Sequence, residues 1–327
     1  MPLTLAYNVE HWPIAGSFGI SRGTKTEAVV VVAELTDGNA RGRGECVPYL
    51  RYAETVESVT AQIEAIRPQI ENGLDRRALQ TAMPPGAARN ALDCAFWDFE
   101  AKRSGRHVYD LAGLSAPNRL TTAFTISLAA PEEMAKAAER VASRALLKVK
   151  LGAERDSERI AAVRAAAPKA TLIVDANEGW TEDNLVANLA ACAQAGVALI
   201  EQPLPAGNDR ALAGLRRTIP ICADESAHDR ASLPALGGKY DAVNIKLDKA
   251  GGLSEALAMA AEAEQQRFTI MVGCMVATSL AMAPAVLVAQ KATFVDLDGP
   301  LLLSKDRADG LRYEDSLVYP PSFAFWG

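Results

Sequence analysis

The sequence of 327 residues has no clustered cysteines, no surplus of positive charge and no long apolar run. Its five cysteines are scattered without a Cys-X-X-Cys pair, which argues against a disulfide framework or a thiolate zinc site. Lys and Arg number 34 against 40 Asp and Glu, so the net charge of −6 provides no broad positive surface for nucleic acid. The longest apolar run, residues 281–289, is far shorter than the roughly 18 residues of a membrane span. We expect reduced, buried thiols and a protein that binds neither nucleic acid nor membranes.

Targeting signals and histidine are also scarce. The first twenty residues lack both a positively charged start before an apolar stretch and a small-residue cleavage site, so we expect a cytoplasmic protein. Only three histidines occur, at positions 11, 107 and 228, which leaves little material for a histidine-based site. The composition of 49% hydrophobic and 23% charged residues is that of an ordinary globular protein.

The first third of the chain has the pattern of a small α+β domain. A β-branched run at 27–35 precedes an Asp-Gly-Asn turn and a second strand-like segment at 39–47. Helical segments follow at 57–71 and at about 85–104, and apolar side chains form one face of the second. Strands followed by helices favour an α+β domain over residues 1–115, against which the C-terminal segment 305–327 is expected to pack.

Residues 116–304 alternate short β-rich runs with Ala-rich segments of helical period. Eight strands joined by crossovers are what a closed parallel α/β barrel requires. An open doubly wound sheet is the rival, but no Gly-X-Gly-X-X-Gly turn follows the first strand. The sequence therefore predicts a barrel of the TIM type. The eight runs are 121–128, 146–152, 171–177, 198–203, 220–226, 242–247, 269–274 and 293–298.

Charged residues recur where the predicted strands end, which in such a barrel is the face that carries the chemistry. Asp175, Glu201 and Asp224 end three consecutive strands and should converge on one point. Three carboxylates without a soft ligand suit a hard divalent cation, above all Mg²⁺, with the remaining positions open to water or substrate. Zinc would call for histidine or cysteine, and none of the histidines lies in a predicted strand.

Lysines flank these acids from two sides. Lys150 ends the second predicted strand and Lys246 ends the sixth, across the barrel, so the two can approach a bound substrate from opposite faces. Such a pair suits removal of a proton from the carbon beside a carboxylate, with the cation stabilising the developing charge. A lysine base needs a lowered pKa, and burial near Mg²⁺ and Lys148 can supply it. Racemisation or epimerisation is the expected outcome.

These residues occur in motifs that resemble the enolase superfamily, in its muconate-lactonizing subgroup, over nearly the whole chain. The resemblance implies a modified (β/α)₇β barrel under an α+β capping domain. It also implies that Asp175, Glu201 and Asp224 bind Mg²⁺ and that Lys150 and Lys246 are the acid/base pair. Lys148 would then neutralise the substrate carboxylate. The motifs are KVK at 148–150, DANEGW at 175–180, EQP at 201–203, ADES at 223–226 and NIKLDKAGG at 244–252.

Two further features resemble dipeptide epimerases of the L-Ala-D/L-Glu type. Asp296 and Asp298 share one face of the last strand, and the resemblance implies that they receive the substrate's N-terminal ammonium. Arg22 lies in segment 16–28, which is similar to a capping loop of that group, and would hold a glutamate side-chain carboxylate bidentately.

The second capping segment of that group resembles residues 44–55, although Ala53 stands where glycine is expected. Arg51 and Tyr52 are candidate lid contacts in this segment. Thr125 on the first strand and Met275 after the seventh are further candidates for the pocket wall.

The expected activity is thus Mg²⁺-dependent epimerisation at the α-carbon of the C-terminal residue of a dipeptide, with a role in recycling cell-wall peptides implied by the resemblance alone. Cycloisomerisation, o-succinylbenzoate synthesis and N-acylamino-acid racemisation are alternatives on the same scaffold, and a non-catalytic ligand-binding barrel is another. The alternative substrates lack a free ammonium, which would leave the aspartate pair without a role. Barrels of this class often assemble into homo-oligomers, but no apolar stripe in the sequence marks an interface.

Overall fold

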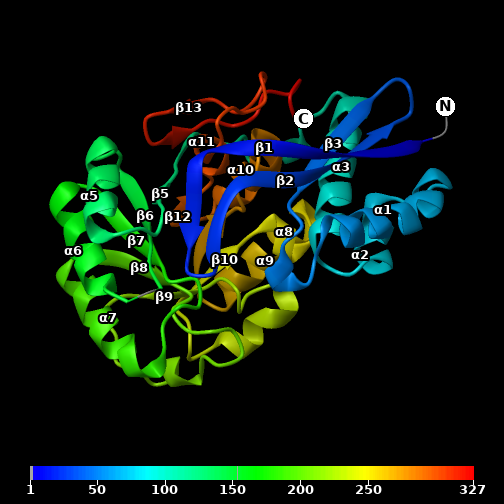
Figure 1. The fold of residues 1–327 in the computed structure, drawn as a ribbon. Coiled ribbons are helices and arrows are strands. Elements are labelled where there is room, and N and C mark those ends of the chain that lie inside the picture. The colour runs from blue at the N-terminus through cyan, green and yellow to red at the C-terminus, as the bar shows by residue number, and fades with distance from the viewer. Residues whose placement is uncertain (1–2, 153) are drawn as a thin grey trace.

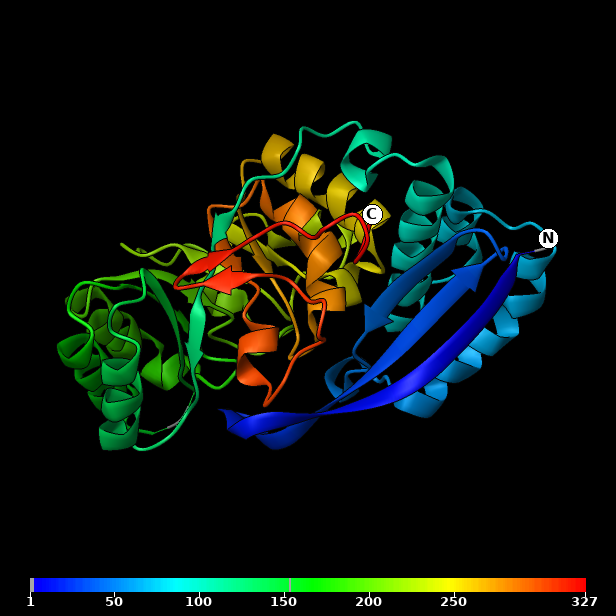
Figure 2. The same ribbon diagram turned by 90° about the horizontal axis from the view of Figure 1, so that it is seen from above.

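The structure is a computed structural model that describes residues 3–152 and 154–327. It has two parts, an antiparallel sheet backed by helices and a parallel barrel, as Figures 1 and 2 show from two directions. The expected fold class, a modified α/β barrel with an α+β cap, is confirmed. Among the described residues, no helix combines the length and apolar character that a membrane crossing requires.

The cap is a three-stranded antiparallel sheet in the order β1-β2-β3, covered on one side by helices. Its strands are β1 (Thr4–Ile20), β2 (Gly23–Thr36) and β3 (Arg41–Cys46). They are followed by the 3₁₀ helix η1 (Leu50–Tyr52) and by α1 (Val56–Glu71), α2 (Arg76–Ala82), α3 (Ala87–Ser104) and α4 (Val108–Leu111). Helix α3 is buried along most of its length because it lies between the sheet and the barrel helices α8 and α9.

Segment 16–28, treated above as a loop, is instead the end of a long β-hairpin. Phe18 pairs with Lys25 and Ile20 with Gly23, so only Ser21 and Arg22 form the turn. Gly23 has φ of 134°, a conformation that only glycine adopts easily, which allows so tight a reversal. The hairpin bends where its register shifts between Pro13 and Phe18, and its tip reaches over the barrel (Figure 1).

The barrel is one sheet of eight parallel strands in the sequential order β5 to β12. The backbone N–H of Ala123, just before β5, donates to the carbonyl oxygen of Val295 in β12 at 2.8 Å and joins the two edges of the sheet. The strands are β5 (Phe124–Ile126), β6 (Leu146–Lys150), β7 (Thr171–Asp175), β8 (Val197–Glu201), β9 (Ile221–Ala223), β10 (Ala242–Ile245), β11 (Thr269–Gly273) and β12 (Phe294–Asp296). Each lies within one of the eight predicted runs, except that β8 begins one residue before its run.

Helices cover the outside of the barrel (Figure 1), but two of the seven crossovers contain only 3₁₀ helices. Prolines at 203, 205 and 220 stand at the two ends of the first of these crossovers and shorten the stretch left for a helix, and Pro234 lies inside the 3₁₀ helix of the second and is followed by two glycines. The helices are α5 (Pro131–Arg140), α6 (Asp156–Ala166), α7 (Glu182–Gln194), η2 (Arg210–Leu212), η3 (Arg230–Leu236), α8 (Leu247–Ala250), α9 (Leu253–Gln265), α10 (Ser279–Ala289) and α11 (Gly299–Leu302).

Side chains that alternate along the strands fill the barrel in layers. A buried apolar cluster occupies its interior and includes Leu146, Ile173, Leu199 and Cys222. Each of these residues stands two positions before a charged residue of the strand end. Because side chains two apart point the same way, the apolar layer leads directly to a charged layer above it.

The C-terminal segment contacts both parts of the molecule. Strands β13 (Tyr313–Glu314) and β14 (Leu317–Val318) extend a small antiparallel sheet with β4 (Leu120–Thr121). The last residues reach the cap, where the Trp326 indole N–H donates to the Arg43 carbonyl oxygen at 3.1 Å and the Gly327 N–H donates to Asp98 at 2.8 Å. A division of the chain near residue 115 stays a prediction, which these contacts and the two separate sheets support.

The close packing of β3 against α3 in the cap can be tested by substitution of a glycine. A Cβ on Gly44 would lie 2.1 Å from the Ala91 carbonyl oxygen of α3, whereas a Cβ on Gly237 would meet nothing closer than 3.8 Å. Gly44→Ala should lower the free energy of unfolding by at least about 2 kcal/mol, because the helix backbone must shift to accept the methyl group. Gly237→Ala is the control and should leave it within about 0.5 kcal/mol. Urea denaturation measures both, and equal stabilities would contradict this account of the packing.

Candidate active site

Three carboxylates meet at the mouth of the barrel. Asp175 ends β7, Glu201 ends β8 and Asp224 follows β9, and their oxygens lie within 4.8 Å of one another. All three side chains are buried. The structure thus brings the predicted ligand set together, and its donors are hard oxygens that suit a divalent cation such as Mg²⁺.

Neighbouring amides hold these carboxylates in place. The Asn177 N–H and side-chain amide both donate to Asp175, at 2.9 and 3.1 Å. The Asn244 amide donates to Glu201 at 2.7 Å. Such contacts fix the orientation of potential metal ligands before a cation binds, which favours affinity.

One lysine lies at each end of this row of acids. Lys150 Nζ is 2.6 Å from Asp175, and Lys246 Nζ is 2.7 Å from Asp224. Their strands, β6 and β10, are four apart in an eight-stranded barrel and therefore stand on opposite sides. This is the arrangement expected from the sequence.

A third predicted lysine, Lys148, occupies the centre. Its Nζ lies 2.7 Å from Glu201, 2.8 Å from Asp296 and 3.2 Å from Asp175. Sequence reasoning missed a fourth lysine, Lys249, which is fully buried in α8 and donates to Asp224 at 2.6 Å. Its position within the NIKLDKAGG motif was the available signal.

Burial and mutual charge set the pKa values in this cluster. Burial lowers the pKa of Lys246, but the carboxylates of Asp224 and Glu201 more than offset it and hold that pKa well above its ordinary value. Burial also raises the pKa of Glu201 to about 7, and the charge of Asp175 adds to this rise. Without a bound cation, the acids thus keep Lys246 protonated, and Glu201 is the acid most easily protonated near neutral pH.

The predicted aspartate pair lies on the far side of Lys148. Asp298 accepts the backbone N–H of Thr125 at 2.7 Å. Burial, followed by the charge of Asp296, raises the pKa of Asp298 to about 7. Asp296 Oδ1 has no hydrogen-bond partner among the described residues, so the pair offers acceptor capacity to a cationic group.

A cavity of about 720 Å³ connects these groups to the cap. Both predicted acid/base lysines and all seven predicted substrate contacts line it. These are Arg22, Tyr52, Thr125, Lys148, Lys150, Lys246, Met275, Asp296 and Asp298. Asp224 also lines the cavity, while the hairpin tip and η1 form the side opposite the strand ends.

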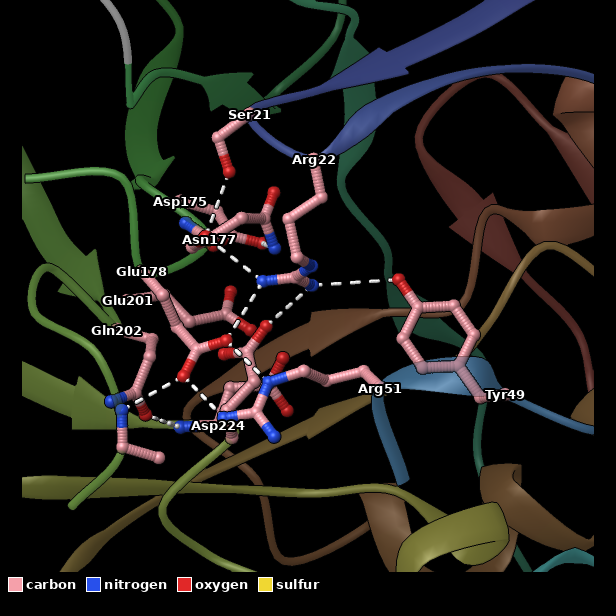
Figure 3. Close-up of polar contacts among 12 residues, drawn as sticks. Ser21, Arg22, Tyr49, Arg51, Asp175, Asn177, Glu178, Glu201, Gln202 and Asp224 are labelled. Atoms are coloured by element: carbon pink, nitrogen blue, oxygen red, sulfur yellow. Dashed lines mark hydrogen bonds and ion pairs between the residues drawn. The ribbon is translucent and has the colours of Figure 1, made fainter. Parts of the chain in front are cut away.

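Arg22 meets protein carboxylates that sequence reasoning did not foresee. Its guanidinium donates to Glu225 at 2.7 Å, to the Asn177 carbonyl oxygen at 2.9 Å and to Glu178 at 3.1 Å (Figure 3). Burial lowers the pKa of Arg22, but Glu225 and Tyr49 together outweigh burial and raise it overall. No short-range signal announces these contacts, because the partners are more than 150 positions away in sequence.

In the second capping segment, Ala53 stands where glycine is expected and adopts a backbone conformation typical of glycine. Ala53 adopts φ of 58° and ψ of 29°, the left-handed conformation in which glycine is usual. This turn ends η1 and places Tyr52 in the cavity, where its ring lies 5.0 Å from that of His228. Arg51 also lines the cavity, and its guanidinium turns toward Glu178 (Figure 3).

Comparison with protein families covers both parts of the chain. The family described as "Mandelate racemase / muconate lactonizing enzyme, N-terminal domain" matches residues 3–113. The family described as "Enolase C-terminal domain-like" matches residues 133–322.

Two characterised relatives are similar over nearly their whole length. L-Ala-D/L-Glu epimerase of Escherichia coli is 49% identical over 93% of this chain and 95% of its own. N-acetyl-D-glutamate racemase of a Pseudoalteromonas species is 44% identical over 91% of this chain and 95% of its own.

Solved structures agree with these matches. An enolase family member from Agrobacterium tumefaciens, described with homology to dipeptide epimerases and with bound sodium and L-Ala-L-Glu, is 55% identical with a TM-score of 0.98 over the full length of both chains. A dipeptide epimerase from Enterococcus faecalis, complexed with Mg and L-Leu-L-Tyr, is 28% identical with a TM-score of 0.90 over 98% of both chains.

The carboxylate cluster yields a test by cation binding. Because a cation binds the charged carboxylate, a pKa of about 7 at Glu201 should weaken Mg²⁺ binding below that pH and leave it strong above. The dissociation constant from calorimetry should be about tenfold higher at pH 6 than at pH 8. Glu201→Gln should bind at least about tenfold more weakly at pH 8. The exposed Asp183→Asn is the control and should bind as the native chain does. Unchanged affinity in the Glu201 variant would contradict this ligand set.

Proposed function

The chain belongs to the mandelate racemase/muconate lactonizing enzyme family of the enolase superfamily, and on this premise we propose that it is a Mg²⁺-dependent dipeptide epimerase of the L-Ala-D/L-Glu type. The observation that carries the proposal is the placement of Lys150 and Lys246 on opposite sides of three converging carboxylates. An inversion at carbon needs one group to remove a proton and another to return it from the opposite face.

The three acids, through a bound cation, and Lys148 bind and polarise the substrate carboxylate. Asp175, Glu201 and Asp224 would hold the cation, which when bound supplies positive charge to the substrate carboxylate and offsets the acids that keep Lys246 protonated. Lys148 contributes a fixed positive charge beside the same carboxylate.

Proton transfer belongs to the two flanking lysines. The neutral amine of one removes the α-proton of the C-terminal residue and becomes an ammonium. The ammonium of the other, Lys150 or Lys246 according to the epimer, gives a proton to the opposite face. The α-carbon is thereby inverted, and the two lysines have exchanged protonation states.

Charged residues of the cavity wall recognise the two ends of the substrate. Asp296 and Asp298 suit the N-terminal ammonium of a dipeptide. Because the pKa of Asp298 is raised, a cationic group that arrives beside the pair stabilises the charged form of Asp298. Arg22 would bind the side-chain carboxylate of a C-terminal glutamate, and the similar Agrobacterium protein with L-Ala-L-Glu supports this choice. A role in recycling cell-wall peptides, a cytoplasmic location and assembly into homo-oligomers belong to the same proposal and rest on sequence arguments.

Racemisation of an N-acylated glutamate is the second candidate, because one relative at 44% identity is an N-acetyl-D-glutamate racemase. Such a substrate keeps both carboxylates but has no ammonium. The two candidates therefore differ in whether the aspartate pair is needed.

The lysine pair is tested by hydrogen exchange at the substrate. With Mg²⁺ in D₂O, L-Ala-L-Glu should take up deuterium at the glutamate α-carbon, as followed by NMR. Lys150→Gln and Lys246→Gln should each lose epimerisation by at least about 10³-fold, because one face lacks its proton carrier. Each variant should still exchange the α-proton of one epimer, and the two variants should favour opposite epimers. No exchange by the native chain with any dipeptide would overturn the proposed function.

The aspartate pair is tested by Asp298→Asn. Asparagine can still accept the Thr125 N–H but loses the charge that faces a substrate ammonium. The kcat/KM for L-Ala-L-Glu should fall about 100-fold, whereas that for N-acetyl-glutamate should change by less than about threefold. Equal loss for both substrates would remove the case for ammonium recognition, and faster turnover of the acetylated substrate by the native chain would favour the second candidate.

A further inference from the structure

We propose that Glu178 is a positioning residue that latches both capping segments, residues 16–28 and 44–55, to the rim of the barrel and so orients Arg22 toward the substrate. The part that concerns substrate rests on the function proposed above, whereas the latch itself does not. Glu178 lies in the turn after β7, and Figure 3 shows it facing an arginine from each segment.

One carboxylate joins three separate parts of the chain. Arg51 of η1 binds it bidentately, with Nε 2.7 Å from Oε2 and Nη2 2.6 Å from Oε1. Arg22 of the hairpin turn donates to Oε2 at 3.1 Å. The backbone N–H of Ala206, in the crossover after β8, donates to Oε1 at 2.8 Å. Neither segment can leave the rim without giving up a charged contact to the same side chain.

The turn that carries Glu178 is itself firmly held. Asn177 and Glu178 both have left-handed backbones, with φ of 44° and 66°, so the chain reverses sharply directly after Asp175. The Glu178 N–H donates to the Gln202 carbonyl oxygen at 2.9 Å. The hairpin docks on the same turn, because the Ser21 hydroxyl donates to the Asn177 carbonyl oxygen at 2.7 Å. The latch is therefore three residues from a predicted metal ligand and rigidly connected to it.

The Glu178 carboxylate is shielded from water, while its two arginine partners are partly exposed. The Glu178 side chain is only 9% exposed, and two guanidinium groups face it. Charge-assisted bidentate pairs in such surroundings are stronger and more directional than exposed ion pairs. Removing the charge deprives Arg51 of its carboxylate partner Glu178 and leaves Arg22 with Glu225 as its remaining carboxylate.

The consequence for recognition concerns the plane of the Arg22 guanidinium. Glu178 and the Asn177 carbonyl oxygen hold Nη1, while Glu225 and the more distant Tyr49 hydroxyl hold Nη2. A guanidinium fixed at both ends needs little further ordering to meet a substrate carboxylate, which it would bind through its Nε–H and through the Nη2 hydrogen released from the long Tyr49 contact. Loss of Glu178 should weaken recognition of an anionic side chain more than it slows proton transfer.

Hydrogen exchange of the native chain and of Glu178→Gln tests the latch without any substrate. The glutamine can still accept the Ala206 N–H but cannot form the charged contacts to either arginine. Mass spectrometry should show amides of both 16–28 and 44–55 exchanging about tenfold faster or more, because one contact holds both segments. Glu182→Gln, an exposed residue at the start of α7, is the control and should exchange as the native chain does. Faster exchange in one segment alone, or in neither, would overturn the proposal.

Kinetics then test the consequence for substrate. In Glu178→Gln the KM for L-Ala-L-Glu should rise about tenfold while kcat stays within about threefold and Mg²⁺ affinity is unchanged. The KM for L-Ala-L-Gln, whose side chain is uncharged, should stay within about twofold. Equal changes for both substrates, or a loss confined to kcat, would overturn the orienting role. If the native chain turned over no dipeptide at all, the proposed function would fail, whereas the exchange experiment would still decide the latch.

Discussion

The structure depends on compensation among buried charges at the mouth of the barrel. Three carboxylates from adjacent strands lie close enough to repel one another, and all are removed from water. Lys148 stands at their centre, with Lys150 and Lys246 at the two ends, and each ammonium contacts at least one of these acids. Charges buried at this density are tolerated only when paired, so the same residues that serve the chemistry also make the folded site possible.

Much of the barrel and its chemistry could be predicted from the sequence, because both follow short-range rules. Strands of a parallel barrel recur at regular spacing, and alternation along a strand places Lys148 with Lys150 and Asp296 with Asp298 on the inner side. The carboxylates of consecutive strand ends then had to converge, as Asp175 and its two neighbours do. No contact with a distant segment was needed for this inference.

The cap shows where such reasoning ends. The 16–28 segment forms a hairpin rather than a loop, and two crossovers have only 3₁₀ helices. The contacts of Arg22 and Arg51 with Glu178 join residues more than 120 positions apart, for which periodicity carries no information. Asp248 also connects the two parts. It stands two positions after Lys246 in the barrel and accepts a hydrogen bond of 3.0 Å from the backbone N–H of Val47, which belongs to the cap. Partners of this kind become visible only when the two parts are seen packed together.

The glycines of β3 have a consequence for how this scaffold can diversify. Where Gly42 and Gly44 pass α3, even a methyl group would strike the helix backbone, so the cap's sheet and its central helix leave no slack for new side chains. The hairpin turn and η1, in contrast, are held to the barrel chiefly by the side chains of Arg22 and Arg51, with one backbone contact beside the turn, from the Leu128 N–H to the Gly19 carbonyl oxygen. Substitutions can therefore accumulate at these two tips without disturbing the packing behind them. New substrate preferences can therefore arise at the two tips while the sheet keeps its packing against the helix.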